Sequence, residues 1–186
     1  MASPALQRAS YADYLATERE TGLRHEFLDG EVRLMSGGTL RHSALKTNLG
    51  ALLRDGLRGG PCRPYDADAR LRVPATGLAT YADFAIVCGP PVPHAEDPLA
   101  YTNPTALFEV LSPTTEAWDR GGKFLHAQQL PSLRWYVLVS QDAPRVEVYT
   151  RRDDGWTYAV HVDGAVRWAD LGLALHLSEL YADLPP

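Results

Sequence analysis

Two carboxylates occupy positions where strands normally carry apolar side chains. Glu109 interrupts the run Ala-Leu-Phe-Glu-Val-Leu, and Asp83 directly precedes the run Phe-Ala-Ile-Val. With the two-residue period of a β-strand, Glu109 shares a face with Leu107 and Leu111 and points into a covered region. Because burying an isolated charge is costly, Glu109 must be protonated, paired with a cation or bound to a metal ion.

Together with a lysine further along the chain, these acids predict a metal site that acts on phosphate. If the strands of Asp83 and Glu109 are neighbours, their carboxylates meet at one end of the sheet and can hold a hard cation such as Mg²⁺. Asp119 and Lys123 follow on a predicted helix, four residues apart and therefore on one face. A lysine there could position or deprotonate a metal-bound water, or stabilise charge on a phosphate.

Each of these residues also has a structural interpretation, which the pattern leaves open. Glu109 could pair with an arginine, and Asp83 could cap a turn. Asp119 and Lys123 could form an exposed ion pair that contributes little to stability. His42 opens a predicted helix, where a histidine is usually part of the helix start alone, and we keep it as a candidate because it lies in a basic stretch.

Turn signals and hydrophobic periodicity predict the elements that must position these residues. Ser10 as an N-cap predicts a helix over 11–20, and Asp29-Gly30 predicts the turn of a hairpin. Further helices are predicted over 40–57 and 116–130, and strands over 62–65, 69–73, 82–88, 106–111, 134–139, 145–150 and 156–162. Five prolines within 89–104 predict a long surface loop. We expect one α/β (α+β) domain over 1–186, its core about 10–180, with a mixed sheet flanked by helices.

The composition is that of an ordinary globular protein. Of 186 residues, 45% are hydrophobic and 22% are charged, and the net charge is −5. No apolar run is long enough to cross a membrane, and residues 1–10 lack the apolar core of a secretory signal, so we expect a cytoplasmic protein with no membrane partner. Two cysteines, Cys62 and Cys88, are too few for a disulfide scaffold or a four-thiolate zinc site.

Charge is unevenly distributed along the chain. The segment 33–72 holds eight basic and three acidic residues, a balance of +5, so the remainder carries −10. Such a stretch could follow the phosphates of a nucleic acid, although a solvated, arginine-rich helix is the simpler interpretation.

A series of short motifs spans the chain from about residue 10 to residue 180. It begins with the hairpin 25–32, His-Glu-Phe-Leu-Asp-Gly-Glu-Val, and continues with His42 at a helix start and Asp83 before a strand. The segment 109–115, Glu-Val-Leu-Ser-Pro-Thr-Thr, precedes the Asp119 and Lys123 pair, and the strands 135–139 and 146–149 close the series. This series resembles the Uma-two family of PD-(D/E)xK nucleases, whose hairpin reads YELIDGEV and whose central motif reads EVLSPST.

The resemblance implies a restriction-endonuclease-like fold and a metal-dependent phosphodiesterase. Asp83 and Glu109 would be ligands of Mg²⁺ or Mn²⁺, and Glu26 would be an additional acid. Leu111 stands where many such nucleases have a lysine two residues after the glutamate, so Lys123 would be the catalytic lysine and act from the helix. Ala82, in place of the proline before the aspartate, is a harmless departure.

Two functions of different classes follow. The first is an endonuclease that hydrolyses DNA, with His42, Arg41 and Lys46 contacting the substrate. The second is a nuclease-fold protein with little or no cleavage, which binds nucleic acid or a protein partner; the acidic net charge and the missing strand lysine favour it. Self-association into a homodimer is a further hypothesis, because the segments 135–139 and 171–184 offer apolar surface, which the sequence assigns neither to the core nor to an interface.

Overall fold

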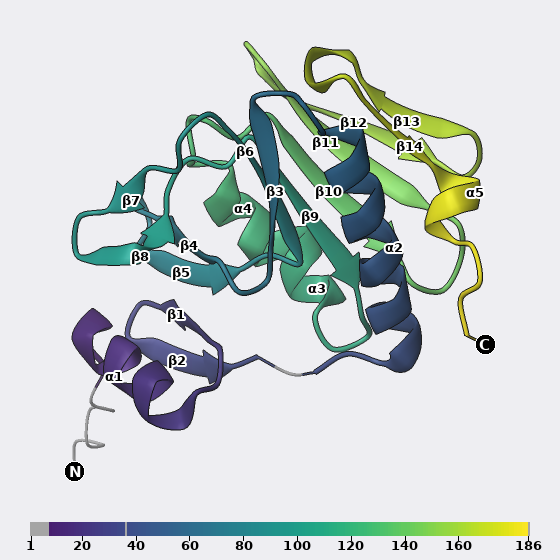
Figure 1. The fold of residues 1–186 in the computed structure, drawn as a ribbon. Helices are drawn as coiled ribbons and strands as arrows, with labels where there is room; N and C mark the ends of the chain where they lie inside the picture. The colour runs from purple at the N-terminus through teal and green to yellow at the C-terminus, as the bar shows by residue number, and fades with distance from the viewer. Residues whose placement is uncertain (1–7, 36, 186) are drawn as a thin grey trace.

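The computed structural model describes residues 8–35 and 37–185, and helices and mixed sheets alternate along them (Figure 1). Most of the segment considered for a secretory signal, residues 1–7, lies outside the described residues. The predicted first helix is present as α1 (Tyr11–Thr21), where Ser10 and Asp13 form a capping box. In the described part of the chain, no helix combines the length and apolar character needed to cross a membrane.

The strands within the described residues form two six-stranded sheets and a small third sheet. The first sheet has the order β2-β1-β5-β4-β8-β7 and consists of β1 (His25–Leu28), β2 (Glu31–Leu34), β4 (Arg70–Val73), β5 (Leu78–Tyr81), β7 (Pro93–His94) and β8 (Asp97–Tyr101). The second has the order β12-β11-β10-β9-β6-β3 and consists of β3 (Cys62–Asp66), β6 (Phe84–Cys88), β9 (Ala106–Leu111), β10 (Trp135–Ser140), β11 (Val146–Arg152) and β12 (Gly155–His161). The third pairs β13 (Ala165–Trp168) with β14 (Leu173–His176).

The hairpin predicted at the N-terminal end is confirmed. Asp29 and Gly30 both have positive φ, 51° and 81°, as a two-residue turn between right-twisted strands requires. The hairpin joins the rest of its sheet through one register pair, Phe27 opposite Ala79. Strand β5 was not predicted, because all four of its residues are buried and it shows no alternation between apolar and polar residues.

The centre of the second sheet contains the parallel pair β9 and β10, joined by a helical crossover. The crossover has three parts: α3 (Glu116–Trp118), a π-helical turn over Asp119–Lys123, and α4 (Phe124–Ala127). The predicted helix over 116–130 is therefore irregular and ends three residues early. Gly122 permits this turn, because a Cβ there would lie 2.0 Å from the ring of Trp118.

The two faces of the second sheet have different covers (Figure 1). On one face, α2 (Leu40–Gly56) packs Leu45, Leu49 and Leu53 against Phe108 and the C-terminal elements. The other face packs against α4 and against β4 and β5 of the first sheet. Because side chains alternate along β9, Glu109 belongs to this second face, between Leu107 and Leu111, as predicted.

The loop predicted over residues 89–104 is wrong in part. It contains the hairpin of β7 and β8, which extends the edge of the first sheet. Strand β8 pairs in parallel with β4 only at Ala100 and Tyr101. Pro93 and Pro98 are compatible with this arrangement, because a strand at a sheet edge does not need every backbone N–H for pairing.

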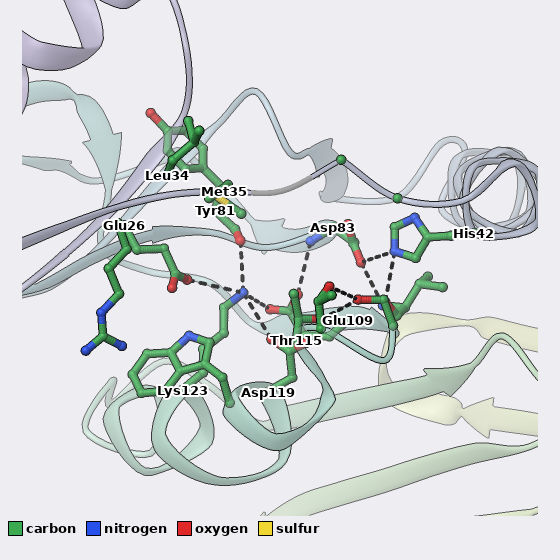
Figure 2. A pocket seen from close by; sticks show the side chains of 17 residues that line it. Glu26, Leu34, Met35, His42, Tyr81, Asp83, Glu109, Thr115, Asp119 and Lys123 are labelled. Atoms are coloured by element: carbon green, nitrogen blue, oxygen red, sulfur yellow. Dashed lines mark hydrogen bonds and ion pairs between the residues drawn. The ribbon is translucent and has the colours of Figure 1, made fainter.

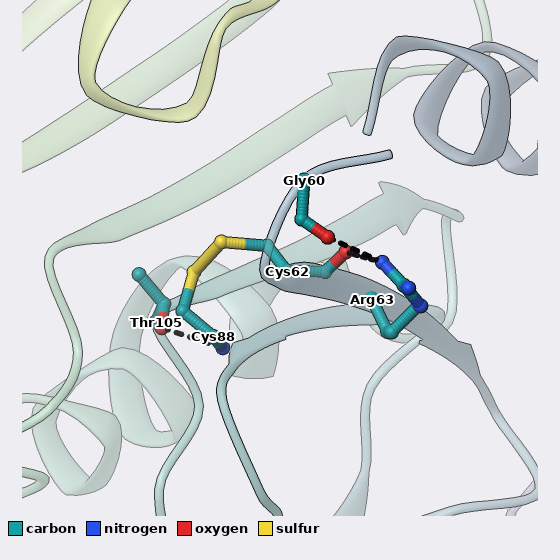
Figure 3. Close-up of a disulfide and its surroundings, with 5 residues drawn as sticks. All are labelled: Gly60, Cys62, Arg63, Cys88 and Thr105. Atoms are coloured by element: carbon teal, nitrogen blue, oxygen red, sulfur yellow. Dashed lines mark hydrogen bonds between the residues drawn. A yellow bond between two sulfur atoms is a disulfide. The ribbon is translucent and has the colours of Figure 1, made fainter. Parts of the chain in front are cut away.

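The two cysteines form a disulfide that links β3 to β6 (Figure 3). Cys62 and Cys88 lie directly opposite each other in the antiparallel register, with their Cα atoms 3.9 Å apart. Strand β3 is an edge strand, and the disulfide fastens its first residue to the last residue of β6.

The apolar segments considered as dimer surface contribute mainly to the core, and the homodimer itself stays a prediction. Every residue of β10 from Trp135 to Val139 is buried in the sheet. The C-terminal segment forms a short 3₁₀ turn (Ala169–Leu171), β14 and α5 (Leu177–Leu180), and Leu173, Leu175 and Leu180 pack against α2 and its cluster.

A buried ionic network attaches α1 to the first sheet. Arg70 on β4 lies 2.6 Å from Glu18 on α1 and 2.5 Å from Asp97 on β8. The Tyr11 hydroxyl also donates to Asp97, at 2.7 Å, and the Tyr81 hydroxyl donates to Glu18, at 2.6 Å. One arginine thus pairs with two carboxylates from elements that are far apart in the sequence.

We expect the substitution Arg70→Met to lower the free energy of unfolding by about 3–5 kcal/mol, because it leaves two buried carboxylates without a cation. Urea denaturation at neutral pH measures the change. Arg24→Met is the matched control, since Arg24 pairs with Asp68 at an exposed position and its loss should cost at most about 1 kcal/mol. Equal losses in the two variants would contradict the importance of burial.

Candidate active site

Four carboxylates from separate elements gather around a cavity of about 270 Å³ (Figure 2). Glu26 comes from β1, Asp83 from the residue before β6, Glu109 from β9 and Asp119 from the π-helical turn. Lys123 lies among them. The prediction that Asp83 and Glu109 meet is correct, because β6 and β9 are antiparallel neighbours.

Lys123 is the central group of this cluster. Its Nζ lies 2.9 Å from Glu109 Oε1, 3.5 Å from Asp119 Oδ1 and 3.9 Å from Glu26 Oε1. The ammonium also donates to the backbone carbonyl of Tyr81, at 3.0 Å. The Lys123 side chain is only 5% exposed, so the interpretation of Asp119 and Lys123 as a surface ion pair is wrong.

Asp83 and Glu109 are held by each other's strands. The backbone N–H of Val110 donates to Asp83 Oδ2 at 2.7 Å, and the backbone N–H of Asp83 donates to Glu109 Oε2 at 3.4 Å. Glu109 Oε1 forms an ion pair with Lys123 but is buried and has no hydrogen-bond partner among the described residues. The ammonium of Lys123 is therefore the one charged partner of that oxygen among the described residues.

A histidine and a second lysine hold Asp83 from the side of α2. His42 Nε2 lies 2.9 Å from the carbonyl oxygen of Val110, which requires a hydrogen on Nε2, and 3.6 Å from Asp83 Oδ2. Lys46 Nζ lies 2.7 Å from Asp83 Oδ1. One helical turn separates these two residues, so they reach the same carboxylate. His42 therefore does more than begin the helix.

Burial and charge shift the pKa values of the acids in opposite directions. Burial raises the pKa of Glu109 well above its ordinary value; Lys123 opposes this shift, and Asp119 and Asp83 add to it. Burial also raises the pKa of Asp119, again against the influence of Lys123. For Asp83, burial is outweighed by the contacts with His42 and Lys46, and the pKa falls to about 2.

Lys123 remains an ammonium in this environment. Burial alone would lower its pKa, but the carboxylates of Glu109, Asp119 and Glu26 outweigh this effect and raise it above the ordinary value. The four carboxylates of the cluster face two lysines, a formal balance of −2. The cluster as a whole therefore attracts cations.

The basic stretch over 33–72 does not form one surface. Arg41 donates to the carbonyls of Gln141 and Pro185, and it lines neither the cavity of the cluster nor the one beside it. Arg70 pairs with Glu18 and Asp97 in the buried network, and Arg72 donates to the carbonyl of Gly77. Of the residues proposed to contact substrate, His42 and Lys46 lie at the site and Arg41 does not.

Two residues that contribute to the site were not predicted from the sequence. The backbone carbonyl of Tyr81 binds Lys123, and the hydroxyl of Thr80 donates to Glu26. Both residues belong to the unpredicted strand β5. A backbone carbonyl leaves no signal in the residue type, and a threonine in a strand is too common to single out.

Comparisons with known proteins identify the family. The model of the Uma2 family, described as "Putative restriction endonuclease", matches residues 11–178. The chain belongs to the Uma2 family. Two uncharacterized Synechocystis proteins are similar to it: slr1290 is 31% identical over 184 residues, covering 98% of this chain and 96% of the relative. The other, sll1609, is 29% identical over 143 residues, covering 77% of this chain and 81% of the relative.

The fold agrees with this family. A crystal structure described as "a putative nuclease belonging to DUF820", from Anabaena variabilis, matches with a TM-score of 0.71 at 16% identity, covering 87% of this chain and 92% of that chain. The resemblance inferred from the motifs is thereby confirmed, as is the mixed α+β architecture. The family and the fold are nuclease-like.

The residues of the cluster fit a cation that needs few protein ligands. Within residues 8–35 and 37–185, no group of three His, Cys, Asp or Glu side chains is arranged to hold a metal ion. Mg²⁺ is typically bound through one or two carboxylates, with waters and substrate phosphates completing its coordination. Oε1 of Glu109, which has an ion pair but no hydrogen bond among the described residues, and the neighbouring carboxylate of Asp83 match that smaller requirement.

We expect the substitution Glu109→Gln to stabilise the protein increasingly as the pH rises. A raised pKa means that the folded state binds the Glu109 proton more tightly than the unfolded chain does. The wild-type contribution is thus complete below the ordinary value of 4.5 and is lost as the pH rises through the folded-state pKa. Denaturant unfolding of both proteins across this range measures the difference.

The matched control is Glu31→Gln, because the Glu31 side chain is 63% exposed. We expect that substitution to change stability by no more than about 0.5 kcal/mol. A constant difference between wild type and Glu109→Gln at every pH would show that Glu109 does not titrate abnormally.

Proposed function

We propose that this Uma2 protein is a Mg²⁺- or Mn²⁺-dependent endonuclease that hydrolyses DNA phosphodiester bonds through a PD-(D/E)xK-type site. One observation carries the proposal: the carboxylates of Asp83 and Glu109 and the ammonium of Lys123 meet in one cavity. Acidic ligands beside a fixed ammonium are the groups that metal-assisted phosphodiester hydrolysis requires. The family description supports the substrate class.

Asp83 and Glu109 would hold the cation. Both carboxylates are fixed by backbone N–H groups, so little side-chain freedom is lost when they bind it. The net negative charge of the cluster favours the binding of a divalent cation. Once bound, such an ion supplies Lewis-acid polarisation of a phosphoryl oxygen and lowers the pKa of a coordinated water.

The remaining residues of the cluster hold its charged groups in place and stabilise negative charge on the substrate. Lys123, held by the Tyr81 carbonyl and by Glu109, can donate a hydrogen bond to a water or a phosphate oxygen and stabilise negative charge that develops there. Glu26 lies on the other side of the Lys123 ammonium from Glu109, as Figure 2 shows, and its charge would help to keep the ammonium in place. His42 maintains Asp83 in place through the Val110 carbonyl and the carboxylate itself.

The position of Lys123 compensates for the absence of a lysine two residues after Glu109. Leu111, two residues after Glu109, is buried in the hydrophobic cluster between the sheets. Lys123 reaches Glu109 from the crossover helix instead, at 2.9 Å. The ammonium is therefore present beside the glutamate although the strand does not carry it.

We expect wild-type protein to bind Mn²⁺ and to nick or linearise plasmid DNA in its presence, and Glu109→Ala to lose both properties. Isothermal titration calorimetry and agarose electrophoresis measure them. Glu31→Ala is the control, because it removes an exposed acid and should change neither. Cleavage that survives in Glu109→Ala would contradict the proposed ligand role.

We expect Lys123→Met to lower the cleavage rate by about a hundredfold or more while Mn²⁺ binding persists, because the variant loses a positive group near the phosphate and not a ligand. Circular dichroism checks that the protein remains folded after an ammonium is removed from among buried carboxylates. Full cleavage by a folded Lys123→Met protein would remove its catalytic role.

The alternative of a binding module predicts different results. Filter binding at two salt concentrations would then show DNA retention with a steep salt dependence, but no cleavage under any divalent ion. Absence of both binding and cleavage would exclude both DNA functions.

A further inference from the structure

The two lysines of the site are held in different ways. Lys123 is 5% exposed and touches three carboxylates and a backbone carbonyl. Lys46 is 26% exposed and has one ion pair, with Asp83 Oδ1 at 2.7 Å. In the part of the chain that the structure describes, Lys46 has no hydrogen bond that would keep it there if this ion pair were broken.

The two oxygens of Asp83 also differ in their contacts. Oδ2 accepts the backbone N–H of Val110 and faces His42 Nε2. Oδ1 is paired with Lys46. A divalent cation that binds Asp83 through Oδ1 would therefore meet an ammonium already there, and the two positive charges repel each other strongly at such distances.

A second cavity gives Lys46 a place to move. It has a volume of about 690 Å³, and Lys46, Ser43 and Thr47 of α2 contribute to its wall. His42 and Asp83 line both cavities, so the second cavity adjoins the cluster directly. The lysine side chain has a flexible stem of four carbons, which allows its ammonium to turn toward this space without movement of α2.

We propose that Lys46 is a displaceable counter-ion: it neutralises Asp83 while the divalent cation is absent, and it turns into the adjoining cavity to contact a substrate phosphate when the cation occupies Asp83. This inference rests on the proposed function and deepens it. The ammonium keeps a partner in both states, first the carboxylate and then the phosphate. The DNA strand would accordingly enter the cluster along the wall formed by α2.

Metal binding tests the first half of this proposal. We expect Lys46→Met to bind Mn²⁺ about fivefold more tightly than wild type in calorimetry, because a partly exposed competing ion pair is removed. Arg54→Met is the matched control: Arg54 also lies on α2 but is 76% exposed and away from both cavities, so its loss removes the same charge without freeing Asp83. Lys46→Gln repeats the test if the methionine variant does not fold.

DNA binding tests the second half. We expect the dependence of duplex affinity on salt, measured with Mn²⁺ and a phosphorothioate-linked duplex that resists cleavage, to lose about one unit of slope in Lys46→Met, the effect of one phosphate contact. Arg54→Met should retain the wild-type slope.

The outcomes separate this inference from the proposed function. Tighter Mn²⁺ binding and a reduced slope in Lys46→Met support the inference, including the case in which only the variant binds Mn²⁺ measurably. Unchanged or weaker Mn²⁺ binding, or an unchanged slope, overturns it while wild-type cleavage still supports the proposed nuclease. If neither wild type nor Lys46→Met binds Mn²⁺, this inference is overturned, and the proposed function is overturned with it only if wild type also fails to cleave DNA.

Discussion

An ammonium group can remain charged in a protein interior only if carboxylates and carbonyls replace the water that it has lost. Lys123 imposes this requirement on four separate parts of the chain, because its partners come from β1, the end of β5, β9 and its own helical turn. The two sheets must therefore pack so that the end of β5 and the middle of β9 both reach Lys123 on the crossover helix. The contacts of Lys123 therefore constrain both the packing of the sheets and the arrangement of the site.

The residue pattern singled out Asp83 and Glu109, because acids beside or within apolar strands are conspicuous, and it singled out Lys123 by its four-residue spacing from Asp119 on the following helix. It also predicted the face on which Glu109 lies, since strand periodicity fixes that face. It could not predict β5, which is buried on both sides, or the β7–β8 hairpin, whose prolines resemble those of a loop. The partner of Glu109 was also beyond its reach, because the choice between an arginine and Lys123 depends on tertiary packing.

Charge counted along the sequence was misleading for a related reason. The basic excess over 33–72 left open a contact with nucleic-acid phosphates or a solvated helix, but Arg70 and Arg72 lie on β4, where Arg72 is buried and Arg70 pairs with buried acids. Among the described residues of this segment, Lys46 pairs with an acid of the cluster, and Arg33 lines the cavity while it pairs with Glu31. A sum of charges ignores which side chains are consumed by internal partners, and only the folded structure distinguishes them.

The N-terminal corner, α1 with β1 and β2, is connected to the body of the protein by few backbone contacts. One register pair, Phe27 with Ala79, and the network around Arg70 account for much of its attachment. Such a unit can open while the central sheet stays intact, and its amides would then exchange with solvent sooner than those of β9 and β10. Such an opening would take Glu26 away from Lys123 and would leave Asp83 and Glu109 in place, because these two lie on the central sheet or directly before it.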